Sequence, residues 1–295
     1  MSETEPCQEE RCNLPAQPEI VGRTVEAIVI DWDGTAVTDR HSSAAPVRRR
    51  VLALAAAGVD VAVVSGTHVQ NIDRQLRARP SGPGRLWLCV NRGSELFAVT
   101  PAGPELMHRR LASAREDAAL DAVAAQTVDA LRQRGLESRL VVARLNRRKI
   151  DLIPEPEWAD PPKARIADLL TATTQRLQRC GITDLSEIVQ IAMDAAGAAG
   201  LERPRITSDA KHVEIGLTDK SDSMNSVVAL LAARGVGPGL VLVVGDEFAP
   251  IGGVAGSDPQ AEDQRTRFGR VIGPRILRRN VPSARGRRSR KWVHG

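Results

Sequence analysis

Two aspartates, Asp31 and Asp33, end an apolar, strand-like run in the stretch AIVIDWDGT. Residues i and i+2 of an extended chain point the same way, so both carboxylates can face one space, and Gly34 lets the chain turn sharply after them. Like charges this close repel, so they need a cation or a shared proton. Mg²⁺ prefers carboxylate oxygens, water and phosphate, and an ionised aspartate can also act as a nucleophile. Taken alone, the stretch fits an ordinary turn as well as a catalytic site.

Three further segments carry polar groups that could extend such a site. Ser65 and Gly66 follow VAVV, and a hydroxyl with free N–H groups at a helix start binds phosphate. Lys220 stands in LTDKSDSM just before a helical stretch, where its charge opposes the helix dipole. Asp246 is the second residue after LVLVV and would enlarge the acidic cluster. Taken singly, the Ser-Gly pair is also an ordinary turn and the lysine is also a solvated surface residue.

Alternating strand-like and helical stretches must position these groups. We expect strands at 24–30, 59–64, 86–90 and 240–244, with helices at 45–57 and 224–233. This alternation predicts an α/β fold with a parallel sheet and crossover helices. Ligands of such sheets bind at the carboxyl ends of the strands, which is where the polar groups stand.

The middle of the chain has a different order of elements. A helical stretch at 111–134 precedes two strand-like pieces, SRLVVARL and RKIDLI, and two more helical stretches lead to the strand-like KHVEIGL. This order predicts an α+β module inserted into the sheet domain. The expected division is a disordered leader at 1–22, a sheet domain at 23–92 and 206–258, the insertion at 93–205, and a basic, disordered tail at 259–295.

The charge of the chain is concentrated at one end. The formal net charge is +5, but residues 262–295 hold eleven Arg and Lys against two Asp and Glu, so the remainder is mildly acidic. Three interpretations of this basic segment stay open: a solvated disordered tail, a polyanion-binding segment, or an abnormal end that replaces the usual last elements. The first and third are favoured, because only Phe268 and Trp292 are there to stack on bases. Nucleic acid is therefore not an expected partner.

Cysteine usage and hydropathy predict a cytoplasmic protein. The four cysteines, at 7, 12, 89 and 180, form no Cys-x-x-Cys pair and suggest free thiols in a reducing compartment. The acidic, polar first twenty residues do not resemble a secretory signal. No apolar run is long enough to cross a membrane, so no membrane partner is expected.

Four segments together resemble the motifs of the haloacid-dehalogenase-like superfamily. DWDGT, VVSGT, the lysine of VEIGLTDKSDSM and VVGDE occur in the order of that family's motifs, over about 24–258. The resemblance implies a Rossmann-like parallel sheet core with an inserted α+β cap domain. The long insertion resembles the large cap of trehalose-phosphate and sucrose-phosphate phosphatases, and CVNRGSELF resembles the segment that often opens it.

The resemblance also implies a role for each matching residue. Asp31 would be the nucleophile and a metal ligand, while Asp33 would be the general acid and base and would bind the metal through its backbone carbonyl. Lys220 would neutralise negative charge on the nucleophile and the phosphoryl group, and Asp246 would hold Mg²⁺. The residues expected to hold the phosphate are Thr35, Ser65 and Gly66.

The sequence departs from the family pattern near its third and fourth motifs and at its end. Pro250 stands where many relatives carry an acidic residue, and Glu247 or Asp258 could replace it. Ser221 follows Lys220 where glycine is common, and Lys211 competes for the same role. The tail shows no apolar period of the kind that a closing strand and helix would need.

The resulting prediction is a Mg²⁺-dependent phosphomonoesterase of a sugar phosphate or similar small metabolite, acting through an aspartyl-phosphate intermediate. A phosphomutase with the same intermediate is one alternative. The other is a catalytically decayed domain whose basic tail binds an acidic partner. Within the insertion, Arg147–Lys149 is a candidate for substrate contacts, with a solvated hairpin as the favoured interpretation. Substrate identity and oligomeric state stay open.

Overall fold

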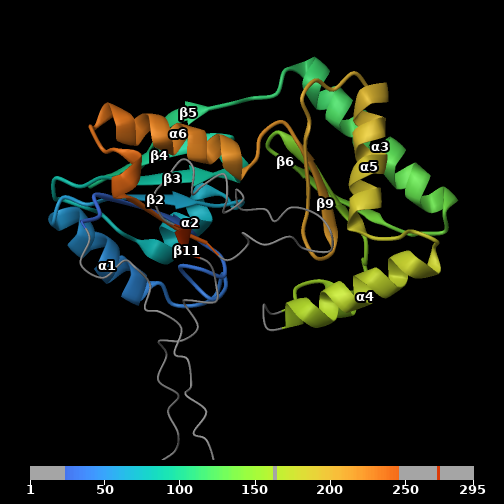
Figure 1. Cartoon of the computed structure of the whole chain (residues 1–295), viewed down its shortest axis with the longest axis horizontal. Helices are drawn as coiled ribbons and strands as arrows, with labels where there is room; N and C mark the ends of the chain where they lie inside the picture. The colour runs from blue at the N-terminus through green and yellow to red at the C-terminus, as the bar shows by residue number, and fades with distance from the viewer. Residues whose placement is uncertain (1–23, 162–164, 246–270, 273–295) are drawn as a thin grey trace, which may run out of the picture.

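The computed structural model describes residues 24–161, 165–245 and 271–272, whose strands form two sheets (Figure 1). The core sheet has seven strands, in the order β11 (Val271–Ile272), β10 (Val241–Val244), β1 (Ala27–Asp31), β2 (Asp60–Val64), β3 (Leu86–Val90), β4 (Glu95–Thr100) and β5 (Gly103–Arg109). The outer sheet has four strands, in the order β6 (Arg139–Arg144), β7 (Arg147–Asp151), β9 (His212–Gly216) and β8 (Arg205–Ser208).

Helices cover both faces of the core sheet. Its strands from β11 to β3 run parallel, whereas β4 and β5 are antiparallel to their neighbours. Helices α1 (Ala45–Ala56) and α2 (Val69–Leu76) pack on one face, and α6 (Lys220–Ala233) packs on the other. Strands β2 and β3 are buried at every position, as their unbroken apolar sequences require. The predicted α/β fold with a parallel sheet is therefore confirmed.

The outer sheet is antiparallel, and helices pack on one of its faces. Helices α3 (Ala114–Gln133) and α5 (Leu185–Ala198) lie on the side turned away from the core sheet (Figure 1), and α4 (Ile166–Arg179) adds Leu177 to the same apolar core. Strand β9 shows the period of two: Val213 and Ile215 point into this core, and His212 and Glu214 line a cleft on the other face. The polar face of the outer sheet is thus the one that faces the cleft.

Two short connecting segments, called crossings here, join the core sheet to the outer sheet, and Asn146 forms hydrogen bonds beside both of them. The chain leaves β5 for α3 through residues 110–113 and returns from β9 to α6 through residues 217–219. Asn146 donates from Nδ2 to the Arg110 carbonyl (2.7 Å) and to Ser94 Oγ (2.9 Å), and its Oδ1 accepts from the Ala112 N–H (2.7 Å). Ser94 Oγ in turn lies 2.7 Å from Thr218 Oγ1 in the second crossing. We call this group the crossing clamp.

Three features of the fold were not predicted from the sequence. Strands β4 and β5, expected within the insertion, belong to the core sheet, and β8 and β9 belong to the outer one. The insertion limits of 93 and 205 remain a prediction, but the strand memberships favour limits within the two crossings. Inside the predicted disordered tail, β11 pairs in parallel with β10, so the prediction is wrong at Val271–Ile272.

The leader, most of the tail and Cys7 and Cys12 lie outside the described residues. Among the described helices, none combines the length and apolar character that crossing a bilayer requires.

Candidate active site

Asp31 and Lys220 meet in a buried ion pair. Asp31 is the last residue of β1 and Lys220 the first residue of α6, and Lys220 Nζ lies 2.8 Å from Asp31 Oδ1. Both side chains are less than 10% exposed. The helix N-terminus disfavours a cation, but Asp219 and Asp222 form a capping box there and supply compensating negative charge. The predicted convergence of the first and third motifs is thus present.

Trp32 fixes the direction of the two aspartates. Its side chain is fully buried in the core cluster, and its Nε1 donates to Gln75 Oε1 of α2 (3.0 Å). Asp31 and Asp33, on either side of it, both line the cleft. The chain then turns at Gly34, whose φ of +92° lies in the region that favours glycine. The i, i+2 argument from the sequence therefore describes the observed arrangement.

The Ser65–Thr67 loop lies at the end of the neighbouring strand. Ser65 Oγ accepts from the Thr67 N–H (3.2 Å), and the loop is held from β3 by the Ser65 N–H, which donates to the Cys89 carbonyl (2.9 Å). Ser65, Gly66 and Thr67 all line the cleft. Thr35, the other residue expected to hold phosphate, stands in the turn after Asp33 but is not among the described residues that line the cleft.

The cleft has a volume of about 460 Å³ and lies between the two sheets. The core sheet and α6 contribute the two aspartates, Lys220 and the Ser65–Thr67 loop. The outer sheet contributes mostly charged side chains from β6, β7 and β9 and from the β8–β9 turn. A small polar or charged ligand would therefore contact both sheets at once.

Comparisons with known proteins agree with this architecture. No family model matches the chain, and no curated protein matches it. Among solved structures, IMP-bound, N-terminally truncated IMP-nucleotidase of Plasmodium falciparum is similar with a TM-score of 0.52 and 10% identity. The match covers 84% of this chain and 64% of that one, so this chain spans less than two thirds of that protein's length. A second structure of the N-terminally truncated nucleotidase has a TM-score of 0.50 and 9% identity, and the match covers 86% of this chain and 68% of that one.

A haloacid dehalogenase-like hydrolase from B. subtilis is also similar, with a TM-score of 0.43, 14% identity and coverage of 86% and 96%. This chain shares its fold with the IMP-nucleotidase over most of its length. Identities this low establish the fold, and the chemistry has to be argued from the site itself.

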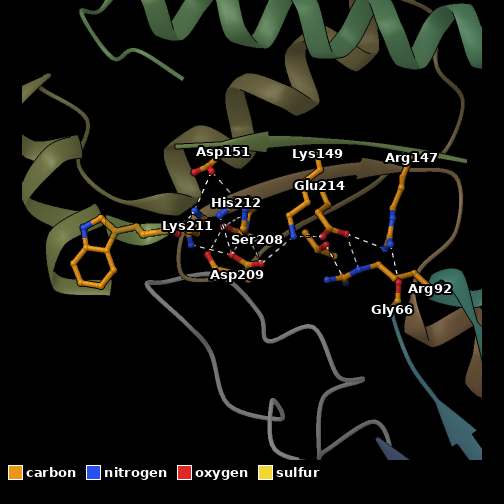
Figure 2. A network of polar contacts seen from close by, with 12 residues as sticks. Gly66, Arg92, Arg147, Lys149, Asp151, Ser208, Asp209, Lys211, His212 and Glu214 are labelled. Carbon is orange, nitrogen blue, oxygen red and sulfur yellow. Dashed lines mark hydrogen bonds and ion pairs between the residues drawn. The ribbon is translucent and has the colours of Figure 1, made fainter. Parts of the chain in front are cut away.

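Glu214 of β9 holds three cations of the cleft (Figure 2). Its Oε2 lies 2.6 Å from Arg92 Nε and 3.2 Å from Arg147 Nη1, and its Oε1 lies 3.1 Å from Lys149 Nζ. Burial alone would raise the pKa of Glu214, but the charges of Arg92, Lys149 and Arg147 outweigh it and lower the pKa to about 2. Glu214 is therefore ionised at neutral pH.

Arg147 extends from the outer sheet to the predicted phosphate loop. Its Nη2 donates to the Gly66 carbonyl (2.7 Å), as Figure 2 shows. Burial lowers the pKa of Arg147 to about 10, with Glu214 opposing the shift and Arg92 and Arg144 adding to it. Arg147 and Glu214 thereby join β7 and β9 to the loops that follow β2 and β3.

The network continues along the outer sheet through Asp209, His212, Asp151 and Lys211 (Figure 2). Lys211 Nζ lies 2.9 Å from Asp151 Oδ2 and donates to the Trp158 carbonyl (2.6 Å). Lys220 rather than Lys211 is therefore the described lysine that contacts Asp31. The sequence alone left this choice open.

The Arg147–Lys149 segment is not a solvated hairpin. Arg147 and Lys149 line the cleft, whereas Arg148 points to the other face and bonds Asp117 and Asp121 of α3 (2.8 and 2.5 Å). The favoured interpretation of this segment was wrong because the sheet has a helix layer behind it, which buries Arg148 to 4% exposure. Glu214 and Arg92 were missed altogether, although a carboxylate inside the apolar run HVEIG was a usable signal.

The donor set of the cleft fits a magnesium ion. Asp31 and Asp33 line it together, and Mg²⁺ binds through one or two carboxylates while keeping waters and substrate phosphate. The described residues contain no group of three or more His, Cys, Asp or Glu suited to a metal. Asp246, the third expected ligand, lies outside the described residues, as do Glu247, Pro250 and Asp258.

Proposed function

We propose that the protein is a Mg²⁺-dependent phosphomonoesterase that hydrolyses a small phosphorylated metabolite, such as a sugar phosphate, through phosphorylated Asp31. The observation that carries the proposal is the contact of 2.8 Å between Asp31 and Lys220, from residues 189 positions apart. A buried ion pair is costly to desolvate and is weak support for stability, which favours a catalytic reason for placing it beside a cleft.

The first chemical step would form an acyl phosphate. An Asp31 carboxylate oxygen attacks phosphorus as the bond to the leaving oxygen breaks, and Asp33 gives that oxygen its proton. Lys220 offsets the negative charge on Asp31 and the phosphoryl oxygens, which otherwise repel each other. Ser65 and the N–H groups of its loop orient the phosphoryl group. A bound Mg²⁺ would supply further charge neutralisation at the same oxygens.

The second step would return the enzyme to its starting state. Water attacks the phosphorus of phosphorylated Asp31, Asp33 accepts a proton from that water, and inorganic phosphate leaves with the Asp31 carboxylate restored. The outer sheet covers this site with the network of Glu214 and Arg147, which limits the access of bulk water during the first step.

A panel of phosphorylated metabolites, with and without Mg²⁺, tests the proposal by phosphate release. Asp31→Asn keeps the size of the side chain but removes the nucleophile, so we expect a loss of at least about 10³-fold in kcat, as for removal of other catalytic nucleophiles. Asp129→Asn, at an exposed position on α3, is the matched control. Unchanged turnover in Asp31→Asn would contradict the proposal, and phosphoryl transfer to a second sugar hydroxyl would identify a mutase.

A further inference from the structure

Arg144 faces the cleft because the register of β6 shifts. Arg139 and Val141 pair with Asp151 and Lys149 of β7, but after a shift in register Arg144 pairs with Arg147. Strict alternation from Arg139 and Val141 would turn residue 144 away from the cleft. Instead, Arg139, Val141 and Arg144 all line the cleft. Such irregularities of a strand redirect side chains next to functional sites.

The shift places two arginines directly opposite each other on neighbouring strands. Like charges in this arrangement destabilise a sheet. No carboxylate among the described residues forms an ion pair with Arg144. Arg147 is 4% exposed, and its Nε has no hydrogen-bond partner within the described part of the chain. This end of the cleft therefore has donors and positive charge without a matching acceptor.

The charges of the outer wall of the cleft do not balance. Its cationic residues are Arg139, Arg144, Arg147, Lys149 and Lys211. Its acidic residues are Asp151, Asp160, Asp209 and Glu214. The excess lies at the Arg144 end, because Glu214 is already shared by three cations and Asp151 and Asp209 pair with groups further along the sheet. A substrate whose only charge is its reacting phosphate would leave this excess uncompensated.

We propose that Arg144 and Arg147 form a second anion site, which selects substrates whose leaving group carries its own carboxylate or phosphate. This inference rests on the proposed phosphatase function. The hydrogen bond from Arg147 to the Gly66 carbonyl sets the site directly beside the loop expected to hold the reacting phosphate. The second anionic group of the substrate would therefore lie near the reacting phosphate, and the planar guanidinium groups suit either kind of anion.

Matched substrate pairs test the site. Glycerol 3-phosphate and 3-phosphoglycerate differ by a carboxylate, and glucose 1-phosphate and glucose 1,6-bisphosphate differ by a phosphate. We expect kcat/KM to be at least about 10-fold higher for the more charged member of one pair, and the pair that responds identifies the anion. Arg144→Gln should remove most of that ratio, and Arg144→Lys should keep part of it. Arg132→Gln, at an exposed position on α3, is the matched control and should keep the full ratio.

The outcomes separate this inference from the proposed function. Equal kcat/KM within both pairs, or a ratio that Arg144→Gln leaves intact, would overturn the second anion site while phosphatase activity stands. An equal loss for both members of a pair would also overturn it, because Arg144 would then serve the reacting phosphate or the fold. If no substrate is hydrolysed, the proposed function fails, and calorimetric titration with 3-phosphoglycerate and glycerol 3-phosphate still decides the site. Tighter binding of the former, lost in Arg144→Gln, supports it, and equal binding refutes it.

Discussion

The backbone at Gly93, just after β3, packs closely against the N-terminus of α6, the helix that carries Lys220. It adopts a φ of +87°, and a Cβ added there would lie 2.4 Å from the carbonyl oxygen of Asp219, the residue that caps α6. The same Cβ would lie 3.0 Å from Asp222 Cβ and 3.1 Å from the Ser223 nitrogen. Gly93→Ala therefore pushes on the N-terminus of α6, one residue from the ion pair with Asp31.

The size of the effect follows from comparison with Gly235→Ala. Gly235 has a φ of +81° but no atom within 4 Å of an added Cβ. Both variants incur the strain of a left-handed alanine, roughly 1–2 kcal/mol. Only Gly93→Ala must also separate two backbones by about 1 Å to reach ordinary contact distance. A displacement of about 1 Å at a catalytic group costs on the order of 10²-fold in rate.

The assay is urea unfolding together with phosphate release, measured on both variants. We expect Gly93→Ala to lose more unfolding free energy than Gly235→Ala and about 10² of kcat, with Gly235→Ala keeping wild-type kcat. Equal losses of stability, together with unchanged kcat in Gly93→Ala, would refute the argument that this close approach positions Lys220.

Three other predictions concern stability and reactivity. Glu214→Gln should lower the unfolding free energy by roughly 3 kcal/mol at pH 7, because its pKa falls from 4.5 to about 2 on folding. This stabilisation is present above pH 4.5 and is lost as pH falls towards 2. The difference in unfolding free energy between the variant and the wild type, measured in urea, should therefore shrink to about half at pH 3. A difference that stays constant with pH would contradict this prediction. Trp32→Ala should cost about 3–5 kcal/mol in the same measurement, since the whole indole is buried, whereas a loss below about 1 kcal/mol would show that the site collapses around it. Burial raises the pKa of Cys89 to about 12, so peptide mapping after alkylation should find the partly exposed Cys180 modified in the native protein and Cys89 modified only in denaturant.

The order of motifs along the chain was enough to predict the centre of the site. Buried apolar runs that end in polar residues place those residues at one edge of a parallel sheet, and this reasoning correctly brought Asp31, Ser65 and Lys220 together. The hairpin of β4 and β5 was missed because its sequence follows Gly93, where the resemblance suggested that the insertion begins.

The charged network could not be predicted by similar means. Glu214 pairs with Arg92, which is 122 positions away and held at a left-handed φ of 51°, and no local pattern specifies such a pair. Arg144 depends on a register shift, which alters the face of a residue without leaving a signal in hydrophobic periodicity. Both features depend on how the two sheets pack against each other, and the secondary-structure propensities of the residues in each sheet do not predict them.

The crossing clamp is placed where a hinge for opening the cleft would have to lie. Asn146, Ser94 and Thr218 hold the two connections between the sheets at one place, so the outer sheet can swing about that place while their hydrogen bonds stay intact. Such a swing parts Arg147 from the Gly66 carbonyl and Glu214 from Arg92. Only residues 217–219 separate the end of β9 from Lys220. Lys220 thus lies beside the pivot, where a rotation displaces atoms least, so under the proposed mechanism the cleft would open to substrate without separating Lys220 from Asp31.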